Sequence, residues 1–272
     1  GCQTELSIDE LIFAACRGGW PSALFKNSDK SKLLVAQSYF EGLCREDISN
    51  IDGKTRDETV TTLLLRSYAR NISTTAANTS ILRDIRANTD IGETTFYEYV
   101  AALKKLFVIQ DIEAWCPAIR SKSSIQSGNK REFVDPSLVV SALGVEPDYF
   151  NLDLKTFGFI FETLCIRDLK IYSNALGGRV SYYRDRYGLE ADCVLHLRDG
   201  KYALIEFKLG SSEIEEGAKH LNEIEKLVEE YNKTEKQCLL RAPDLKIVIT
   251  GTQYGYKRPD GVYVVPIGCL RD

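Results

Sequence analysis

The sequence predicts an α+β protein with more than one domain, and three observations lead to that prediction. The chain has 272 residues, 44% apolar and 27% charged, which is enough for two modest domains that each bury a core. Helical periodicity dominates residues 1–150, whereas strand-like runs alternate with helices after them. We therefore expect a helical segment (1–50), a winged helix-turn-helix domain (51–150) and a mixed sheet flanked by helices (151–272).

Composition limits the classes of protein to consider. A formal net charge of −4 argues against a surface that binds nucleic acid all over, although a local basic patch remains open. No long apolar run or signal-peptide pattern occurs, so we expect neither a membrane span nor secretion. The eight cysteines show no CxxC spacing, which favours reduced thiols and a cytoplasmic location. Because the chain has no methionine, even at position 1, we expect that it begins inside a longer chain or has been processed.

Residues 1–50 read as short helices. Ser7 is a plausible N-cap with Glu10 three residues later, Pro21 starts a second helix after Gly18-Gly19, and a third helix spans about 30–48. We interpret this segment as a small helical packing unit.

The next segment is predicted to form a winged helix-turn-helix. Helices are expected at 59–69, 80–87 and 93–106, and the third has one apolar stripe of Phe96, Tyr99, Val100, Leu103 and Leu106. Its outward face carries side chains that can reach phosphates or base edges, although Glu98 on that face opposes such a role. The candidates are Thr94, Thr95, Tyr97, Lys104 and Lys105. A helical domain used for protein contacts is the alternative interpretation.

A basic stretch without an acid follows at 117–131, before the strand-like REFVDP. Its cations are Arg120, Lys122, Lys130 and Arg131. We interpret the stretch as a candidate wing that contacts phosphates, with a solvated basic loop as the alternative. The following residues, 136–150, predict a short helix and then a linker at Glu146-Pro147-Asp148.

Residues 189–208 predict a hairpin that collects polar side chains on one face. Both runs alternate between polar and apolar residues, and Asp199-Gly200 provides the turn. A three-residue loop with Gly200 in the left-handed conformation places Asp192 opposite Glu206, with Lys208 on the same face. The opposite face is then a clean apolar layer. A two-residue loop would mix polar and apolar side chains on both faces, so we expect the longer loop.

Two carboxylates at cross-strand distance repel each other unless a cation lies between them. Asp192 and Glu206 form the hard-oxygen pair that Mg²⁺ binds together with water and phosphate oxygens. Lys208 could orient a water or stabilise negative charge on a phosphate. Glu162 lies in a helix that is apolar nearly all round, so it needs a partner, either in an ion pair or in the same metal site.

The pattern of Asp192, thirteen residues, and Glu206-Phe207-Lys208, preceded by a helix with an inward Glu162, resembles the PD-(D/E)XK nuclease superfamily. Within it, GFIFETLCIRDL, YYRDRYGLEADCVLHL and ALIEFKLG resemble the carboxy-terminal domain of unknown function that follows the ATPase module in a prokaryotic AAA-type ATPase family.

This resemblance implies a restriction-endonuclease-like fold for residues 151–272. It implies that Asp192 and Glu206 bind Mg²⁺ or Mn²⁺, that Glu162 is an accessory acid and that Lys208 is the catalytic lysine. It also implies an ATPase module of the same full-length protein as a partner. The chain itself contains no Gly-x4-Gly-Lys-Ser/Thr loop, and we therefore expect no ATP site in it.

Two functions follow from these expectations. The first is a metal-dependent phosphodiesterase that acts on DNA, which the winged helix docks. The second is a non-catalytic module that binds DNA or protein and regulates or scaffolds the ATPase, with its polar residues kept as a salt-bridged cluster. The presence of all four residues (Glu162, Asp192, Glu206 and Lys208) favours the first.

Overall fold

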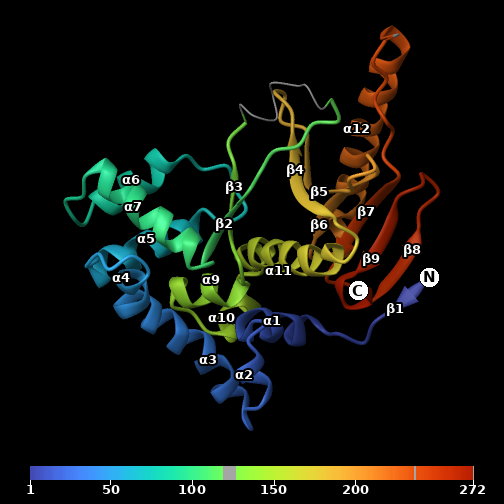
Figure 1. Cartoon of the computed structure of the whole chain (residues 1–272). Coiled ribbons are helices and arrows are strands. Elements are labelled where there is room, and N and C mark those ends of the chain that lie inside the picture. The colour runs from blue at the N-terminus through green and yellow to red at the C-terminus, as the bar shows by residue number, and fades with distance from the viewer. Residues whose placement is uncertain (119–126, 236, 272) are drawn as a thin grey trace. The chain divides into compact units, whose positions relative to one another are not determined.

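The computed structural model describes residues 1–118, 127–235 and 237–271 and divides the chain into two compact units (Figure 1). The sheet unit comprises Gly1–Leu11, Ile112–Ser127 and Cys165–Asp272. The helical unit comprises Ile12–Asp111 and Gly128–Leu164. The helical unit thus draws residues from all three of the predicted domains, and the sheet unit takes its first strand from the start of the chain.

A seven-stranded mixed sheet forms the sheet unit, and the predicted α+β class with a mixed sheet is confirmed. Its strands follow the order β1-β8-β9-β7-β6-β5-β4. Their bounds are β1 Cys2–Gln3, β4 Arg179–Arg184, β5 Glu190–His196, β6 Tyr202–Lys208, β7 Leu245–Thr250, β8 Tyr254–Lys257 and β9 Tyr263–Pro266. Strand β6 pairs with β5 in antiparallel and with β7 in parallel orientation, so it lies inside the sheet with both of its edges hydrogen-bonded.

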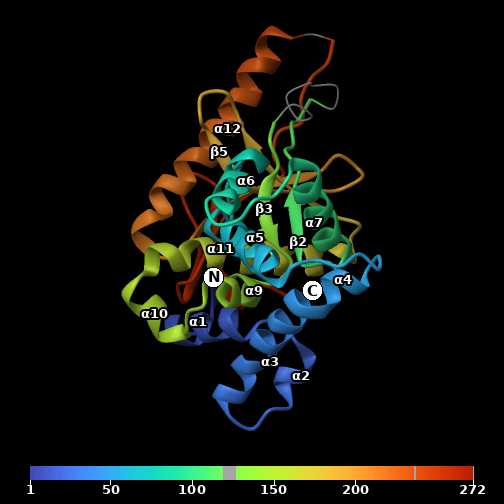
Figure 2. The same cartoon turned by 90° about the vertical axis from the view of Figure 1, so that its left-hand side faces the viewer.

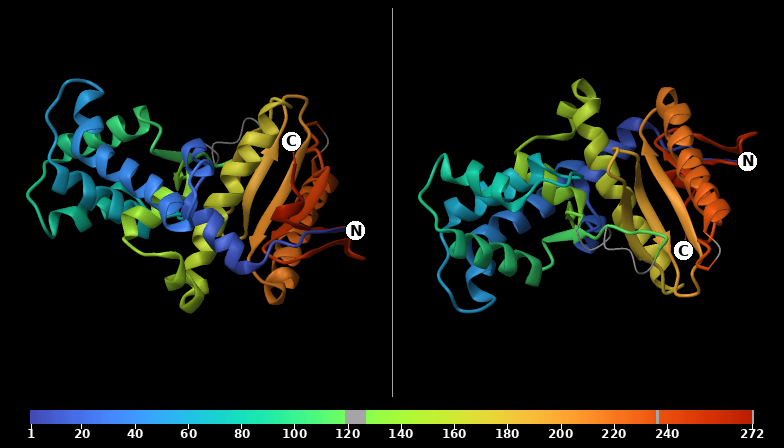
Figure 3. Two further views of the ribbon diagram at one scale, coloured as in Figure 1. Left: turned by 90° about the horizontal axis from the view of Figure 1, so that it is seen from below. Right: turned by 90° about the horizontal axis from the view of Figure 1, so that it is seen from above.

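Helices cover both faces of this sheet. Figure 3 shows α12 (Ile214–Thr234) along one face and the carboxy-terminal part of α11 (Leu154–Asn174) along the other. Helix α12 packs its apolar side onto β5, β6, β7 and β9, because alternate strand residues point towards it. The buried cluster at this contact includes Val194, Leu204, Ala218, Leu221, Val248 and Val264.

From Cys193–Ile205 to the turn, the hairpin of β5 and β6 has the predicted register. Val194 pairs with Leu204 and His196 with Tyr202, and the backbone N–H of Leu197 donates to the carbonyl of Lys201. Gly200 has a φ of +86°, which glycine adopts without the strain that a side chain would bring. The three-residue loop from the predicted sequence pattern is therefore confirmed. Unlike the prediction of one apolar face, both faces are buried, because α12 covers the polar one.

Short helices build most of the helical unit. Their bounds are α1 Ile8–Arg17, α2 Pro21–Leu24, α3 Asp29–Gly42, a π-turn Leu43–Asp47, α4 Ile48–Asn50, α5 Glu58–Arg70, α6 Asn78–Arg86, α7 Glu93–Lys105, α9 Pro136–Leu143 and α10 Pro147–Leu152. The predicted capping box of α1 is present, since Ser7 and Glu10 exchange hydrogen bonds between side chain and backbone N–H. Residues 147–152 form a helix where a linker was predicted, because Pro147 occupies the first helical position.

Three helices precede a small two-stranded sheet in this unit. Figure 2 shows β2 (Ile109–Ile112) and β3 (Lys130–Phe133) side by side, next to α7. Helices α5, α6 and α7 lie within two residues of the predicted bounds, and α7 buries Phe96, Tyr99, Val100 and Leu103 of its predicted apolar stripe. None of the described helices combines the length and apolar composition needed to span a bilayer.

Candidate functional site

Asp192 and Glu206 come together on neighbouring strands of the sheet unit. Oδ2 of Asp192 accepts a hydrogen bond of 2.9 Å from the backbone N–H of Phe207, so its carboxylate reaches across to β6 beside Glu206. The charge of Asp192 acts on Glu206 and raises its pKa, after the larger effect of burial. The structure thus brings the two predicted metal ligands to one place on the sheet.

Both oxygens of Glu206 have a cationic or ionisable neighbour. Nζ of Lys208 lies 2.9 Å from Oε2, and Nδ1 of His220 lies 3.5 Å from Oε1. The Glu206 side chain is only 2% exposed, whereas the side chains of Lys208 and His220 are partly exposed. A buried carboxylate is therefore contacted from two sides, one from its own strand and one from α12.

The electrostatics of this group set the charge of each member. Burial and the charge of Asp192 raise the pKa of Glu206, and the contacts with His220 and Lys208 offset this rise only in part. Burial alone would lower the pKa of Lys208, but the carboxylates of Glu206 and Asp192 outweigh it and the pKa is raised. Lys208 is consequently a cation at neutral pH, which suits charge stabilisation better than proton abstraction.

His220 is a member of the site that the sequence prediction missed. It lies on α12, which presents Gly217 and His220 to β6 while Ala218 and Leu221 enter the core. The signal was the helical spacing: residues 217 and 220 directly precede Ala218 and Leu221 of the apolar stripe, so they face the sheet at the border of that stripe.

The donor set fits a hard divalent cation. Asp192 and Glu206 offer carboxylate oxygens, which Mg²⁺ and Mn²⁺ bind together with water. Within residues 1–118, 127–235 and 237–271, no group of three or more His, Cys, Asp or Glu side chains is arranged to hold a metal ion. A cation at this place would therefore complete its coordination with water or substrate oxygens, as Mg²⁺ commonly does.

Glu162 belongs to the other unit of the structure. It lies in the part of α11 that is assigned to the helical unit, and its Oε1 is 2.6 Å from Nζ of Lys130. The Lys130 and Glu162 side chains are 3% and 12% exposed. The buried glutamate has the ion-pair partner that its environment requires, and its role as an accessory acid stays a prediction.

The predicted outward face of α7 is exposed. Solvent reaches all five of its candidates, Thr94, Thr95, Tyr97, Lys104 and Lys105. Lys104 forms an ion pair with Asp111, and Glu98 on the same face pairs with Lys54. The positive potential of this face is thus partly neutralised.

Lys130 and Arg131 do not lie on a basic loop as predicted. Both are in β3 and buried, at 3% and 7% exposure. Lys130 pairs with Glu162, and Nη1 of Arg131 lies 3.0 Å from Oδ1 of Asp111. Because buried cations need acidic partners, these two side chains are held inside the unit and away from phosphates. The other two candidates of this stretch, Arg120 and Lys122, lie outside the described residues.

Four exposed arginines that the prediction did not include lie on the neighbouring helices α5 and α6. We call Arg66, Arg70, Arg83 and Arg86 the arginine cluster. The helices are side by side, since the hydroxyl of Ser67 donates to Asp84 at 2.7 Å and Nη1 of Arg70 lies 3.6 Å from the same carboxylate. Their spacing of three or four residues on each helix was the available signal.

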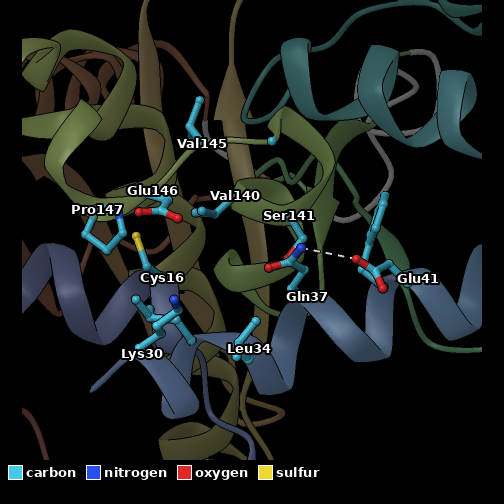
Figure 4. Close-up of a pocket in the computed structure, with 13 residues that line it drawn as sticks. Cys16, Lys30, Leu34, Gln37, Glu41, Val140, Ser141, Val145, Glu146 and Pro147 are labelled. Atoms are coloured by element: carbon cyan, nitrogen blue, oxygen red, sulfur yellow. Dashed lines mark hydrogen bonds between the residues drawn. The ribbon is translucent and has the colours of Figure 1, made fainter. Parts of the chain in front are cut away.

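A pocket of about 580 Å³ lies in the helical unit between α3 and the segment that joins α9 to α10 (Figure 4). Its lining includes Cys16, Lys30 and Glu146, and Gln37 and Glu41 of α3 share a hydrogen bond of 3.1 Å there. Burial raises the pKa of Cys16 to about 12, so this thiol stays protonated at neutral pH. None of the described candidate site residues lines the pocket.

Two family models match the chain. The model of a domain of unknown function, DUF8612, matches residues 8–149, which is more than half of the chain. The model of a second domain of unknown function, DUF4143, matches residues 157–270. DUF4143 is commonly associated with the carboxy-terminal regions of AAA-type ATPases. No curated protein and no solved structure matches the chain.

Proposed function

The chain belongs to the family of the domain of unknown function DUF8612, and we propose that it is a metal-dependent DNA phosphodiesterase of the PD-(D/E)XK type that works with an AAA-type ATPase module. The observation that carries the proposal is the meeting of Asp192 and Glu206 beside Lys208. The DUF4143 match over residues 157–270 supports the link to an ATPase.

The acids are the ligands in this proposal. Glu206 is buried at the centre of the sheet and Asp192 is half-buried, so both carboxylates are held by strands and not by a loop. Rigid elements keep ligand oxygens in a fixed geometry. A bound Mg²⁺ or Mn²⁺ ion would supply neutralisation of phosphate charge and an activated water. Each carboxylate must be ionised to serve it.

Lys208 acts as an ammonium group. Its raised pKa keeps it charged, and its Nζ lies 2.9 Å from Glu206, close to where a phosphate oxygen would meet the acids. A lysine in this position can donate hydrogen bonds to the attacking water or to a phosphate oxygen on which negative charge develops. We assign to it this stabilising role in place of proton abstraction.

The helical unit docks the nucleic acid. The order of three helices followed by a two-stranded sheet supports the winged helix-turn-helix interpretation of α5, α6, α7, β2 and β3. The arginine cluster and the exposed face of α7 supply groups that bind phosphates. Such contacts fix the position of the duplex without reading its sequence.

One observation favours the second candidate, a non-catalytic module that scaffolds or regulates an ATPase. The two oxygens of Glu206 are already contacted by Lys208 and His220, and this satisfies the carboxylate without a metal. A salt-bridged cluster of this kind would preserve the fold and leave the winged helix to bind DNA or protein.

Cleavage assays separate the two candidates. Labelled single-stranded and double-stranded DNA is incubated with Mg²⁺ or Mn²⁺ and the wild type, Asp192→Ala, Lys208→Ala or Lys201→Ala. Lys201 is the matched control, since it is an exposed lysine at the other end of β6 that pairs with Asp199. We expect cleavage that Lys201→Ala keeps and the other two variants lose. Equal cleavage by all four proteins would contradict the proposal, and DNA binding without cleavage would favour the second candidate.

A further inference from the structure

Helix α12 brings a side chain from outside the hairpin to the second oxygen of Glu206. Nδ1 of His220 lies 3.5 Å from Oε1, while Nζ of Lys208 lies 2.9 Å from Oε2. One neighbour comes from the same strand as Glu206, and the other comes from a helix that packs across the sheet. The orientation of this carboxylate therefore depends on two independent elements.

A close approach of the helix backbone sets the position of His220. A Cβ atom built on Gly217 would lie 3.2 Å from Cε of Lys208 and 3.3 Å from Cβ of Glu206, so the helix backbone rests directly on both side chains. Gly217 and His220 are three residues apart and share one face of the helix. The buried residues Ala218 and Leu221 fix the rotation of α12 on the sheet. Core packing thus places the imidazole.

The difference in exposure shows on which side the imidazole lies. The His220 side chain is 33% exposed and that of Glu206 is 2% exposed. His220 consequently stands at the solvent side of a carboxylate that is otherwise enclosed. Partners of this kind orient metal ligands, and their loss commonly weakens metal binding by about 10–100-fold.

We propose that His220 is the positioning residue of the divalent-cation site, which holds Oε1 of Glu206 so that this carboxylate and that of Asp192 bind one Mn²⁺ or Mg²⁺ ion. The inference rests on the proposed function, because it takes the two acids as the ligands. Lys208 does not replace His220, because it contacts the other oxygen and approaches from within the strand.

Calorimetric titration of the whole 272-residue protein with Mn²⁺, without nucleic acid, tests this role. The variants are His220→Ala, His220→Asn, His220→Gln and Asp192→Ala, with Lys219→Ala as the matched control on the exposed side of the same helix. Asparagine carries a side-chain nitrogen near the place of Nδ1, whereas glutamine carries one near the place of Nε2. We expect His220→Ala and His220→Gln to bind Mn²⁺ about 10–100-fold more weakly, His220→Asn to recover most of the affinity, and Lys219→Ala to bind as the wild type does.

The outcomes distinguish this inference from the function on which it rests. If Asp192→Ala abolishes binding while His220→Ala binds as tightly as the wild type, the positioning role is overturned and the metal site stands. If the wild type binds no Mn²⁺, the metal site fails and the role of His220 fails with it. If His220→Asn is as weak as His220→Ala and both have lowered Tm values in metal-free buffer, the histidine serves packing and the inference is overturned.

Discussion

Nζ of Lys208 lies 2.9 Å from Oε2 of Glu206, two residues earlier on the same strand, and this ion pair interrupts a strand that is otherwise apolar and buried. Strand β6 lies between β5 and β7, so Glu206 is placed where a protein of purely structural design would carry a valine or isoleucine. Buried charges with raised or lowered pKa values are typical of functional sites. Glu206 is such a group, because its surroundings in the folded protein raise its pKa and so disfavour its ionised form.

Replacing that acid by its neutral isostere should not destabilise the protein. Burial and Asp192 raise the pKa of Glu206, which means that the ionised form is less favourable in the folded than in the unfolded chain. We expect Glu206→Gln to have a Tm that is unchanged or higher by roughly 2–4 °C, the shift that about 1 kcal/mol produces in a chain of this size. Mn²⁺ binding should be lost. Differential scanning calorimetry would contradict this expectation with a lowered Tm, and Glu190→Gln, whose carboxylate lies 3.0 Å from Arg184, is the control.

The substitution Gly217→Ala should push α12 away from Glu206 and Lys208 on β6. It would meet Lys208 and Glu206 at 3.2–3.3 Å, closer than most such contacts, and overpacking of this kind costs about 1–3 kcal/mol. Gly158 on α11 is the control, because a Cβ there meets nothing within 4 Å. Relief of backbone entropy should stabilise Gly158→Ala by roughly 0.5–1 kcal/mol. Urea unfolding of the two variants measures both changes, and equal stabilisation would show that the contact can relax.

The buried pair of Asp111 and Arg131 should stabilise the helical unit in a pH-dependent way. Burial raises the pKa of Asp111, but contacts with Lys104, Tyr68 and Arg131 outweigh burial and lower it. A carboxyl group with a lowered pKa adds stability above its unfolded pKa and loses it as the pH falls towards the folded one. We expect Asp111→Asn to lose about 3–5 kcal/mol at neutral pH, because it leaves Arg131 without its buried anion, and less as the pH falls below about 4.

Asp29→Asn provides the comparison for that measurement. Asp29 pairs with Lys32 at 2.9 Å, but its side chain is 72% exposed, and such surface pairs contribute at most about 1 kcal/mol. Denaturant unfolding at several pH values would show a large pH-dependent difference for Asp111→Asn alone. A similar small effect of both variants would mean that the Asp111 pair is not desolvated.

The arginine cluster should determine how DNA binding responds to salt. Each phosphate contact adds about 0.9 to the slope of log affinity against log salt concentration, so Arg66→Ala and Arg83→Ala should each reduce the slope by about one. The loss of affinity should be similar for different sequences, because phosphate contacts do not read bases. Fluorescence anisotropy with unrelated duplexes measures both quantities. Arg45→Ala, an exposed arginine of the π-turn, is the control, and an unchanged slope in all three variants would contradict the assignment.

The sequence predicted those features that depend on residues close together in the chain. The register of β5 and β6 followed from alternation and from one glycine with a φ of +86°, both of which lie within twenty residues. The capping box at Ser7 followed from a spacing of three residues. Side-chain positions that depend on distant elements were not predictable in this way. His220 meets Glu206 only because α12 folds back over the sheet after a turn of the chain.

The prediction from charge composition was wrong for Lys130 and Arg131, which are buried in β3. Lys130 and Arg131 follow a stretch without acids, which favoured a solvated basic loop. Their partners are Glu162, 32 residues away, and Asp111, 20 residues away. Neither ion pair can be predicted from the residues next to Lys130 and Arg131, because the partners are distant in the sequence and meet only in the folded chain. The strands β1 and β8 escaped prediction for a different reason: they have two and four residues, too few to show a clear alternation of polar and apolar side chains.

The first strand has a practical consequence for anyone who wishes to isolate the sheet unit. Cys2 and Gln3 pair with Gly255 and Tyr254, and Trp115 stacks on Tyr202 at a ring distance of 4.5 Å. A fragment that starts at residue 151 would lack both β1 and Trp115. The backbone of β8 would then be an open edge, and the ring of Tyr202 would lose the contact with Trp115. Such edges recruit strands from other molecules. We therefore expect the fragment from residue 151 to aggregate, whereas in the 272-residue chain β1 pairs with β8 and Trp115 packs on Tyr202.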